Sequence, residues 1–339
     1  MAIRVAINGF GRIGRAFFRV AQTRTDMEVV AINDLGDINN LAYLLKYDSV
    51  YGRAPFYISV AGGSLVVNEK AIEVFSEKDP THLPWRDHNI DVVVESTGLF
   101  TDYDKANVHI VSGAKRVVIT APVKTDSDIG ATVLMGLNED RLISNKITSN
   151  ASCTTNAASP IISILDKELG IDRALLTTTH AYTASQSIVD GYSKKDWKEG
   201  RAAAQNIIPT STGAAVAVTK AYPTLVNRFD GISLRVPVPA GSITDVTLIA
   251  KRDTTAEEVN EILRKAARDP HWEGIFTATD EDLVSSDIIG DPHAAIAALP
   301  MTRAIGNLVK VLTWYDNEIG YCHMLARHVA ASGALAHAA

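Results

Sequence analysis

Three glycines near the start of the chain constrain the fold more than any other feature. Gly9, Gly11 and Gly14 have the spacing G-x-G-x-x-G, after an apolar run at residues 3–8 and before a helical pattern at residues 15–23. In such a unit one glycine makes the turn, one admits a pyrophosphate and one lets helix and strand approach closely. The pyrophosphate lies on the helix N-terminus. The pattern predicts a Rossmann-type dinucleotide-binding domain.

The choice of dinucleotide depends on Asp34, which follows a second strand-like run at residues 28–32. It lies about 20 residues beyond the last glycine, where an acidic side chain binds the ribose hydroxyls of NAD. A carboxylate at this position repels the extra phosphate of NADP, so NAD is the expected cofactor. The alternative is that Asp34 only caps a strand end.

Further strands are expected at residues 91–95, 116–120 and 146–149, with a hairpin at 62–75 that turns at 68–70. Ligands of open α/β sheets bind at the carboxyl ends of the strands. Thr120 ends one of these runs, and we therefore expect it near the nicotinamide.

Composition limits the classes of protein to consider. A chain of 339 residues usually forms two domains, and a net charge of −6 argues against a nucleic-acid or anionic-membrane surface. No apolar stretch is long enough to span a bilayer, and residues 1–4 lead straight into a strand-like run, so no signal peptide is expected. The two distant cysteines indicate free thiols in a reducing compartment, the cytoplasm.

Cys153 is the expected nucleophile. It lies among small hydroxylic residues, in the run Ala-Ser-Cys-Thr-Thr-Asn at 151–156, before an apolar helical run at 157–169. A thiolate forms more readily at the positive N-terminal end of a helix. The other cysteine, Cys322, lies in an apolar helical run and is expected in the core. No metal-ligand cluster surrounds His323 or His328, and no metal is expected.

From residue 173 the pattern changes to longer alternating strands, at residues 174–179, 231–236, 243–250 and 308–314, with a helix at 256–268. Such alternation is typical of a largely antiparallel sheet with helices on one face. The fold class is therefore α/β: a Rossmann-type domain plus an α+β catalytic domain with a mixed, largely antiparallel sheet. The boundary is expected near Asn150.

Several polar residues of this second half are candidates for the site. His180 ends a strand and has the chemistry of a general base, although structural or solvated roles are more common for a lone histidine at a strand end. Residues 210–213, Thr-Ser-Thr-Gly, provide hydroxyl and N–H groups suited to a phosphate. Arg235 is a cation inside an apolar strand and needs an anion, either a ligand or an internal carboxylate. Arg201 has the weakest local signal and reads equally well as a solvated loop residue.

Read together, these segments resemble the phosphorylating, NAD-dependent glyceraldehyde-3-phosphate dehydrogenases along nearly the whole chain. The resemblance rests on residues 7–14, 44–49, 149–156, 206–215, 234–237 and 314–318, in this order. It implies an NAD-binding domain at 1–150 joined by a C-terminal helix at 318–339, a catalytic domain at 151–317, and a homotetramer.

The resemblance also implies roles for individual residues. Cys153 is the nucleophile and His180 its base. The NAD contacts implied are Gly9, Gly11, Arg12, Ile13, Gly14, Asp34, Lys78, Thr120 and Asn317. Ser152, Thr154, Thr212 and Gly213 are implied for inorganic phosphate, and Thr183 and Arg235 for the phosphate of the substrate. Arg201 matches an arginine near these anion sites. The implied reaction is the glycolytic oxidation of glyceraldehyde 3-phosphate, with inorganic phosphate, to 1,3-bisphosphoglycerate through hemithioacetal and thioester intermediates.

Departures from the family pattern leave some alternatives open. Ala157 replaces a second cysteine common in relatives, and Tyr192 replaces a proline of NAD-specific relatives, which leaves use of NADP open. Pro160 requires the helix after Cys153 to bend or to leave a carbonyl unpaired. A dehydrogenase of erythrose 4-phosphate, a semialdehyde dehydrogenase, a thiol hydrolase and a non-catalytic NAD-sensing role are the competing functions.

Overall fold

The computed structural model describes residues 2–125, 127–194 and 196–338. The chain divides into two compact units. Unit 1 comprises Met1–Met135, Glu139–Ala151 and Cys322–Ala339, and unit 2 comprises Gly136–Asn138 and Ser152–Tyr321. None of the helices in the described ranges has both the length and the apolar composition that crossing a bilayer requires.

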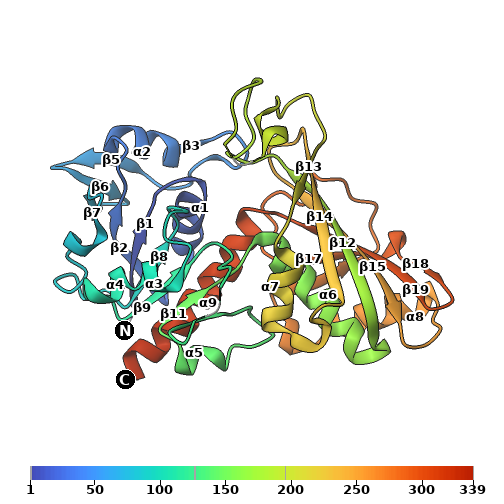
Figure 1. Ribbon diagram of the computed structural model, residues 1–339. Coiled ribbons are helices and arrows are strands. Elements are labelled where there is room, and N and C mark those ends of the chain that lie inside the picture. Colours follow the sequence, from blue (N-terminus) through green and yellow to red (C-terminus); the bar gives the residue numbers. More distant parts are fainter. Residues whose placement is uncertain (1, 126, 195, 339) are drawn as a thin grey trace. The chain divides into compact units, whose positions relative to one another are not determined.

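Unit 1 is built on a twisted sheet with short helices (Figure 1). Within the described residues the sheet has nine strands, in the order β10-β11-β9-β8-β1-β2-β7-β6-β5. The strands are β1 (Ile3–Asn8), β2 (Met27–Asn33), β5 (Ile58–Ala61), β6 (Ser64–Val67), β7 (Lys70–Phe75), β8 (Val92–Glu95), β9 (Arg116–Ile119), β10 (Gly130–Thr132) and β11 (Ile147–Ser149). The smaller elements of unit 1 are α1 (Arg12–Ala21), α2 (Ile38–Lys46), β3 (Tyr47–Asp48), β4 (Gly52–Arg53), the 3-10 helix Pro80–His82, α3 (Tyr103–Ala106), α4 (Val108–Val111) and α5 (Arg141–Ser144).

The strands from β10 to β7 pair in parallel, as expected for short, fully buried runs such as β8 and β9. The predicted hairpin is confirmed, because β6 and β7 pair antiparallel around a turn at Asn68 and Glu69, whose φ angles are 46° and 71°. The hairpin is part of the main sheet, since β7 pairs with β2 in parallel.

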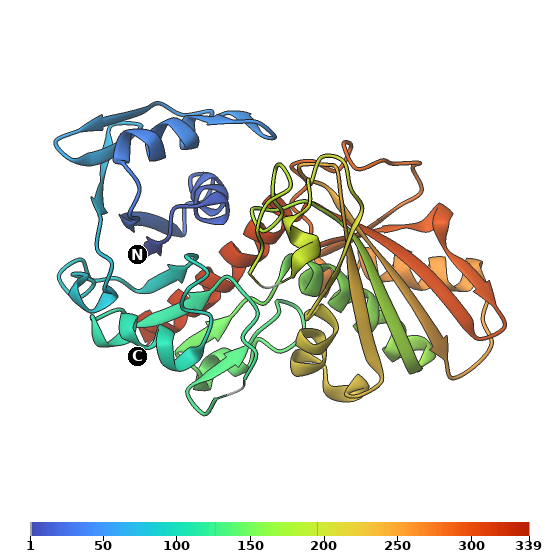
Figure 2. The same ribbon diagram turned by 45° about the horizontal axis from the view of Figure 1, so that its top comes forward.

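Unit 2 contains the long strands, which fan out in one twisted sheet, drawn from green to red in Figure 2. Over the described residues the order is β13-β14-β12-β15-β19-β17-β16, with β18 paired to β19. The strands are β12 (Ile171–Ala181), β13 (Ile208–Ser211), β14 (Phe229–Val236), β15 (Ser242–Ala250), β16 (Phe276–Thr279), β17 (Ala295–Ala298), β18 (Arg303–Ile305) and β19 (Leu308–Tyr315). The pairs β12–β14 and β16–β17 are parallel and the others antiparallel, which confirms the predicted mixed sheet.

One face of this second sheet is covered by helices and the other is open. The helices are α6 (Cys153–Leu169), α7 (Ala214–Ala221) and α8 (Ala256–Ala267), with 3-10 turns at Trp197–Gly200, Pro223–Leu225, Pro270–Trp272 and Leu299–Met301. Along β12, Ala174, Leu176 and Thr178 are buried, whereas Leu175 between them is 65% exposed. This period of two is that of a strand with one covered face.

Helix α6 continues through Pro160. Proline removes the N–H that would reach the carbonyl of Asn156 four residues earlier. The hydroxyl of Ser159 donates to that carbonyl at 3.4 Å, so a side chain takes the place of the missing donor. The last helix, α9 (Ile319–Ala338), is longer than the others, and Cys322 within it is buried as expected.

Candidate active site

The glycine loop after β1 has the geometry expected of a dinucleotide cradle. Gly9 has φ +94°, and a Cβ there would lie 2.6 Å from the backbone nitrogen of Thr97. A Cβ on Gly14 would lie 2.2 Å from the carbonyl oxygen of Gly9, so only glycine lets α1 approach the loop this closely. A Cβ on Gly11 would meet no atom within 4 Å, which leaves this face of the loop open to a pyrophosphate.

Asp34 lies at the end of β2 and faces the same loop. Its Oδ2 accepts from Phe10 N at 2.7 Å and its Oδ1 from Gly36 N at 2.8 Å. A carboxylate has about four acceptor positions, so each oxygen keeps one for a ribose hydroxyl. The open loop and this carboxylate at its edge fit the adenosine half of NAD.

The other residues assigned to NAD lie on different segments of the chain, four of them in unit 1 and Asn317 in unit 2. Arg12 begins α1 and forms an ion pair with Asp48 at 3.1 Å, and Ile13 follows it. Lys78 is exposed. Thr120 follows β9, and its N–H donates to the carbonyl of Glu95 at 3.0 Å. In unit 2, Asn317 is buried, and its Oδ1 accepts from Gly241 N and from Ser242 Oγ, both at 3.1 Å.

Cys153 is the first residue of α6, where the orphan N–H groups of the first turn favour a thiolate. Ser152 caps this helix by accepting from Thr155 N at 3.1 Å. Ala151 before it has φ +53°, a strained conformation for a residue with a Cβ. Such strain is typical of functional sites.

His180 lies against the thiol, as its Nε2 is 3.3 Å from Cys153 Sγ. The two residues come from the start of α6 and the end of β12. Because β12 and β14 pair in parallel with His180 opposite Arg235, the guanidinium of Arg235 reaches the other side of the imidazole ring. The structure therefore brings together Cys153, His180 and Arg235.

The Nδ1 atom of His180 has two neighbours that require opposite protonation. It lies 2.7 Å from the carbonyl oxygen of Ala181, to which an Nδ1–H donates. Arg235 Nη1 also contacts Nδ1, and a guanidinium donates only to an unprotonated nitrogen. In the first state Nε2 presents a lone pair to the thiol, and in the second it presents a proton to a thiolate. The ring can hold its proton on either side.

Burial and Arg235 set the charges of this pair. Burial raises the pKa of the Cys153 thiol, and the positive charge of Arg235 opposes that rise. Burial, together with repulsion from Arg235, lowers the pKa of His180 to about 3. At neutral pH the resting pair is thus a thiol beside a neutral imidazole, the form in which a histidine acts as a base.

The residues assigned to anions are only partly gathered. The hydroxyl of Thr183 bonds Gln186 Oε1 at 3.2 Å and Ser185 Oγ at 3.1 Å. Thr212 Oγ1 accepts from Ala214 N at 3.2 Å, and Gly213 is the N-cap of α7. Arg201 pairs with Asp190 at 3.0 Å. Among the anion candidates, Arg235 is the one that contacts His180.

Tyr315 is a neighbour of the site that the sequence analysis did not single out. Its hydroxyl lies 2.9 Å from Thr154 Oγ1 and 2.8 Å from Thr178 Oγ1, and its ring meets the edge of His180 at a centroid distance of 5.9 Å. Burial raises its pKa above the ordinary tyrosine value, so it stays a neutral phenol. Thr154 is buried, and its hydroxyl is engaged here. The local sequence pattern did not indicate a role for Tyr315, because this residue ends a strand far from Cys153 in sequence.

Comparison with known proteins identifies the family. Residues 3–103 match the glyceraldehyde 3-phosphate dehydrogenase NAD binding domain, and residues 152–317 match the C-terminal domain of the same family. The chain is 48% identical over 343 residues to glyceraldehyde-3-phosphate dehydrogenase of Mycobacterium avium, covering 98% of this chain and 99% of the relative. It is 47% identical over 339 residues to the Geobacillus stearothermophilus enzyme of that name, covering 98% and 100%. Glyceraldehyde-3-phosphate dehydrogenase 1 of Streptomyces avermitilis is 46% identical over 328 residues, covering 96% and 97%. The chain belongs to the glyceraldehyde-3-phosphate dehydrogenase family of NAD-dependent oxidoreductases.

Proposed function

We propose that this protein oxidises D-glyceraldehyde 3-phosphate, with inorganic phosphate, to 1,3-bisphosphoglycerate in glycolysis and gluconeogenesis. The observation that carries the proposal is the distance of 3.3 Å between Cys153 Sγ and His180 Nε2, with Arg235 on the far side of the imidazole. A nucleophile beside a base, with a cation close by, is the arrangement that covalent capture of a phosphorylated aldehyde requires.

The first step is addition of the thiol to the aldehyde. Cys153 Sγ bonds to the carbonyl carbon while His180 Nε2 takes the thiol proton, and the oxyanion then receives this proton to give a hemithioacetal. Bound NAD supplies the acceptor for the hydride that leaves this carbon. His180 removes the hydroxyl proton in the same step, and the carbon becomes a thioester of Cys153.

The second step releases the product. An oxygen of inorganic phosphate attacks the thioester carbon, the carbon–sulfur bond breaks, and the sulfur leaves as a thiolate. His180 returns its proton to the sulfur. Covalent capture thereby divides one difficult oxidation into two easier steps.

Arg235 is the residue we assign first to the phosphate of the substrate, with Thr183. Its Nε is buried and has no hydrogen-bond partner among the described residues, so the guanidinium keeps a donor for an anion. For inorganic phosphate we propose Ser152, Thr154, Thr212 and Gly213. In this proposal the hydroxyl of Thr154 leaves the hydroxyl of Tyr315 and bonds to phosphate when phosphate binds.

We assign NAD to residues 1–150 with helix 318–339, and the covalent chemistry to residues 151–317. Within the first region Gly9, Gly11, Gly14 and Asp34 hold the adenosine and pyrophosphate, by the fit described above, and we assign Arg12, Ile13, Lys78 and Thr120 to further contacts. Asn317 is assigned to the carboxamide.

We further propose a cytoplasmic homotetramer. The open face of the second sheet supports this, since Leu175 on β12, Ile232 on β14 and Leu308 on β19 are 65%, 53% and 45% exposed. Apolar side chains clustered in this way mark a surface that a second copy covers. Sedimentation of the full chain tests the proposal, and a monomer at micromolar concentration contradicts it.

The decisive experiment is NAD reduction with glyceraldehyde 3-phosphate, with and without inorganic phosphate, for the wild type and Cys153→Ser. We expect phosphate-dependent turnover that the substitution abolishes. No turnover despite NAD binding overturns the triose assignment and directs the test to erythrose 4-phosphate. NAD reduction that does not depend on phosphate would mean that water, and not phosphate, discharges the thioester, whereas a thiol hydrolase would reduce no NAD at all.

A further inference from the structure

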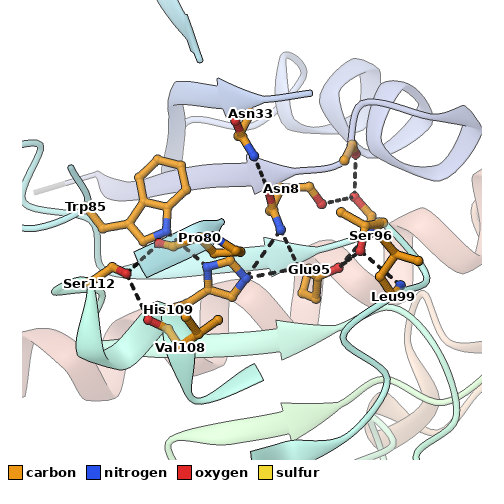
Figure 3. Close-up of polar contacts among 12 residues, drawn as sticks. Asn8, Asn33, Pro80, Trp85, Glu95, Ser96, Leu99, Val108, His109 and Ser112 are labelled. Carbon is orange, nitrogen blue, oxygen red and sulfur yellow. Dashed lines mark hydrogen bonds and ion pairs between the residues drawn. The ribbon is translucent and has the colours of Figure 1, made fainter. Parts of the chain in front are cut away.

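Three buried polar residues form a row across the sheet of unit 1, each at the last position of its strand. Asn33 ends β2, Asn8 ends β1 and Glu95 ends β8, and the strand register places Asn8 opposite both of the others. Their exposed fractions are 5%, 0% and 2%. Figure 3 shows this row continuing from Glu95 to His109 and Trp85. Buried polar groups of this kind require mutual hydrogen bonds.

The two amides are locked in one orientation. Asn33 is held by the backbone of Glu77, donating to its carbonyl at 2.9 Å and accepting from its N–H at 2.8 Å. Asn33 Nδ2 donates to Asn8 Oδ1 at 2.7 Å, so Asn8 must present its Nδ2 to Glu95 Oε2, at 2.6 Å. A flip of either amide would set two donors or two acceptors face to face.

The other end of the row is locked by an indole. Trp85 Nε1, which can only donate, lies 3.1 Å from His109 Nδ1. The proton of a neutral His109 is therefore on Nε2, which donates to Glu95 Oε2 at 3.0 Å. His109 is fully buried and acts as a fixed link between Trp85 and Glu95 (Figure 3).

Glu95 thus has only donors around it. Besides Asn8 and His109 on Oε2, its Oε1 accepts from Thr97 N at 2.9 Å and from Thr97 Oγ1 at 2.5 Å. These four donors fill the acceptor positions of a carboxylate. The side chain of Glu95 is only 1% exposed, so these four hydrogen bonds take the place of water around the carboxylate.

Two of these strand ends lead into the dinucleotide site described above, Asn8 into the glycine loop and Asn33 into Asp34, and Glu95 leads into the loop of residues 96–98. Gly9 follows Asn8 directly, and Ser96 Oγ donates to the carbonyl of Gly9 at 2.6 Å. A Cβ on Gly9 would lie 2.6 Å from Thr97 N, so the glycine turn packs closely against the backbone at Thr97. Glu95 holds this part of the backbone through its hydrogen bonds to Thr97. The backbone carbonyl of Glu95 also accepts from Thr120 N.

We propose that Glu95 is a positioning residue for NAD, and that the row Asn33–Asn8–Glu95–His109 preorganises the glycine loop and the 96–98 loop before the cofactor binds. The inference rests on the NAD site of the proposed function and adds to it residues that do not touch the cofactor. Fixing loops in their bound geometry reduces the ordering cost of binding, so the effect falls on affinity for NAD.

The test is Glu95→Gln, which keeps the shape of the side chain but replaces one acceptor oxygen with a donor. Either orientation of the new amide opposes the N–H of Thr97 or the Nδ2 of Asn8. We expect the Kd for NAD, measured by calorimetry, to rise about 10- to 100-fold. We expect kcat at saturating NAD and the alkylation rate of Cys153 to stay within about threefold. Glu28→Gln is the matched control, because Glu28 lies near the opposite end of β2 in an exposed pair with Lys70.

A second pair of variants keeps the inference testable if Glu95→Gln does not fold. His109→Gln retains a donor for Glu95, and His109→Leu removes it. We expect the Leu variant to bind NAD about 3- to 10-fold more weakly than the Gln variant. Lower melting temperatures with unchanged Kd values would mean a purely structural role and overturn the inference. If the wild type itself fails to bind NAD, the NAD site of the proposed function fails too, whereas equal binding by wild type and variants overturns this inference alone.

Discussion

Both units bury a histidine in a polar cluster, and the two clusters differ in how firmly their protons are placed. His109 stands between a group that can only donate and a carboxylate, so one tautomer fits. His180 stands between a carbonyl oxygen and a guanidinium on the same nitrogen, so two protonation states compete. The first arrangement suits loops that must hold still for a cofactor. The second suits a group that must take up and return a proton in each cycle.

The two clusters also differ in how completely their charged side chains are hydrogen-bonded. Glu95 receives four donors and its charge is fully accommodated. Arg235 keeps a buried Nε without a partner among the described residues, and its charge acts on both Cys153 and His180. An uncompensated cation at this place is costly for the free protein, and an anionic substrate would remove the cost.

The largest effect is expected from His180→Asn, which removes the base but keeps a polar side chain. If the competing protonation states of His180 serve catalysis, kcat should fall about 10²- to 10⁴-fold. Steady-state kinetics at saturating substrate checks this, with the exposed His82→Asn as control. A loss below tenfold would mean that Cys153 reacts without this base.

A smaller effect is expected from Arg235→Leu. Arg235 is the largest of the factors that lower the pKa of Cys153, so removing the cation raises that pKa, and the pKa of His180 rises as well. The pH profile for alkylation of Cys153 should move to higher pH by about one unit, and the KM for the triose phosphate should rise about 10- to 100-fold.

The alkylation profile is measured with iodoacetamide. Arg173→Leu, on the adjacent strand β12, is the control, because Arg173 lies in an exposed pair with Asp172. A profile of Arg235→Leu that coincides with the wild type would contradict the electrostatic role of Arg235.

The smallest effect concerns His328, a third buried histidine, held by Thr148 at 2.8 Å and Asn150 at 3.1 Å. Burial, with repulsion from Arg116, lowers its pKa to about 3. Below about pH 6.5 the unfolded chain binds a proton there and the native chain does not, so stability falls as pH falls, until about pH 3.

Between pH 5.5 and 4.5 the wild type should lose about 1.4 kcal/mol more than His328→Leu in urea unfolding. The difference between the two proteins isolates this group, since other groups titrate in both. Equal losses would show that His328 is protonated in the native state.

The sequence allowed prediction of those features that depend on neighbours in the chain. The spacing of Gly9, Gly11 and Gly14 specifies a turn and a close helix–strand contact, and both are present. Alternation in residues 174–179 and 243–250 indicated a half-covered sheet, and β12 and β15 form one. The limits of β1 were predicted without error, and other strand and helix limits differed by at most four residues, because terminal residues depend on caps such as Ser152 rather than on periodicity.

Features that depend on strand register could not be predicted from the local sequence pattern. Residues 180 and 235 meet because β12 and β14 happen to pair in parallel at that register. The row from Asn33 to Glu95 arises from three strands ending together, and each residue alone reads as an ordinary polar residue after an apolar run. Tyr315 was likewise missed, since nothing near it in sequence points to Thr154 or His180.

The most direct test of the account is to look for the acyl group on the enzyme. Wild-type protein is mixed with glyceraldehyde 3-phosphate and NAD without inorganic phosphate, quenched in acid and measured by intact-protein and peptide mass spectrometry. The account predicts one 3-phosphoglyceroyl group per chain, on Cys153, that disappears when phosphate is added. Reduced NAD without an adduct on Cys153, or an adduct that phosphate does not discharge, would contradict it.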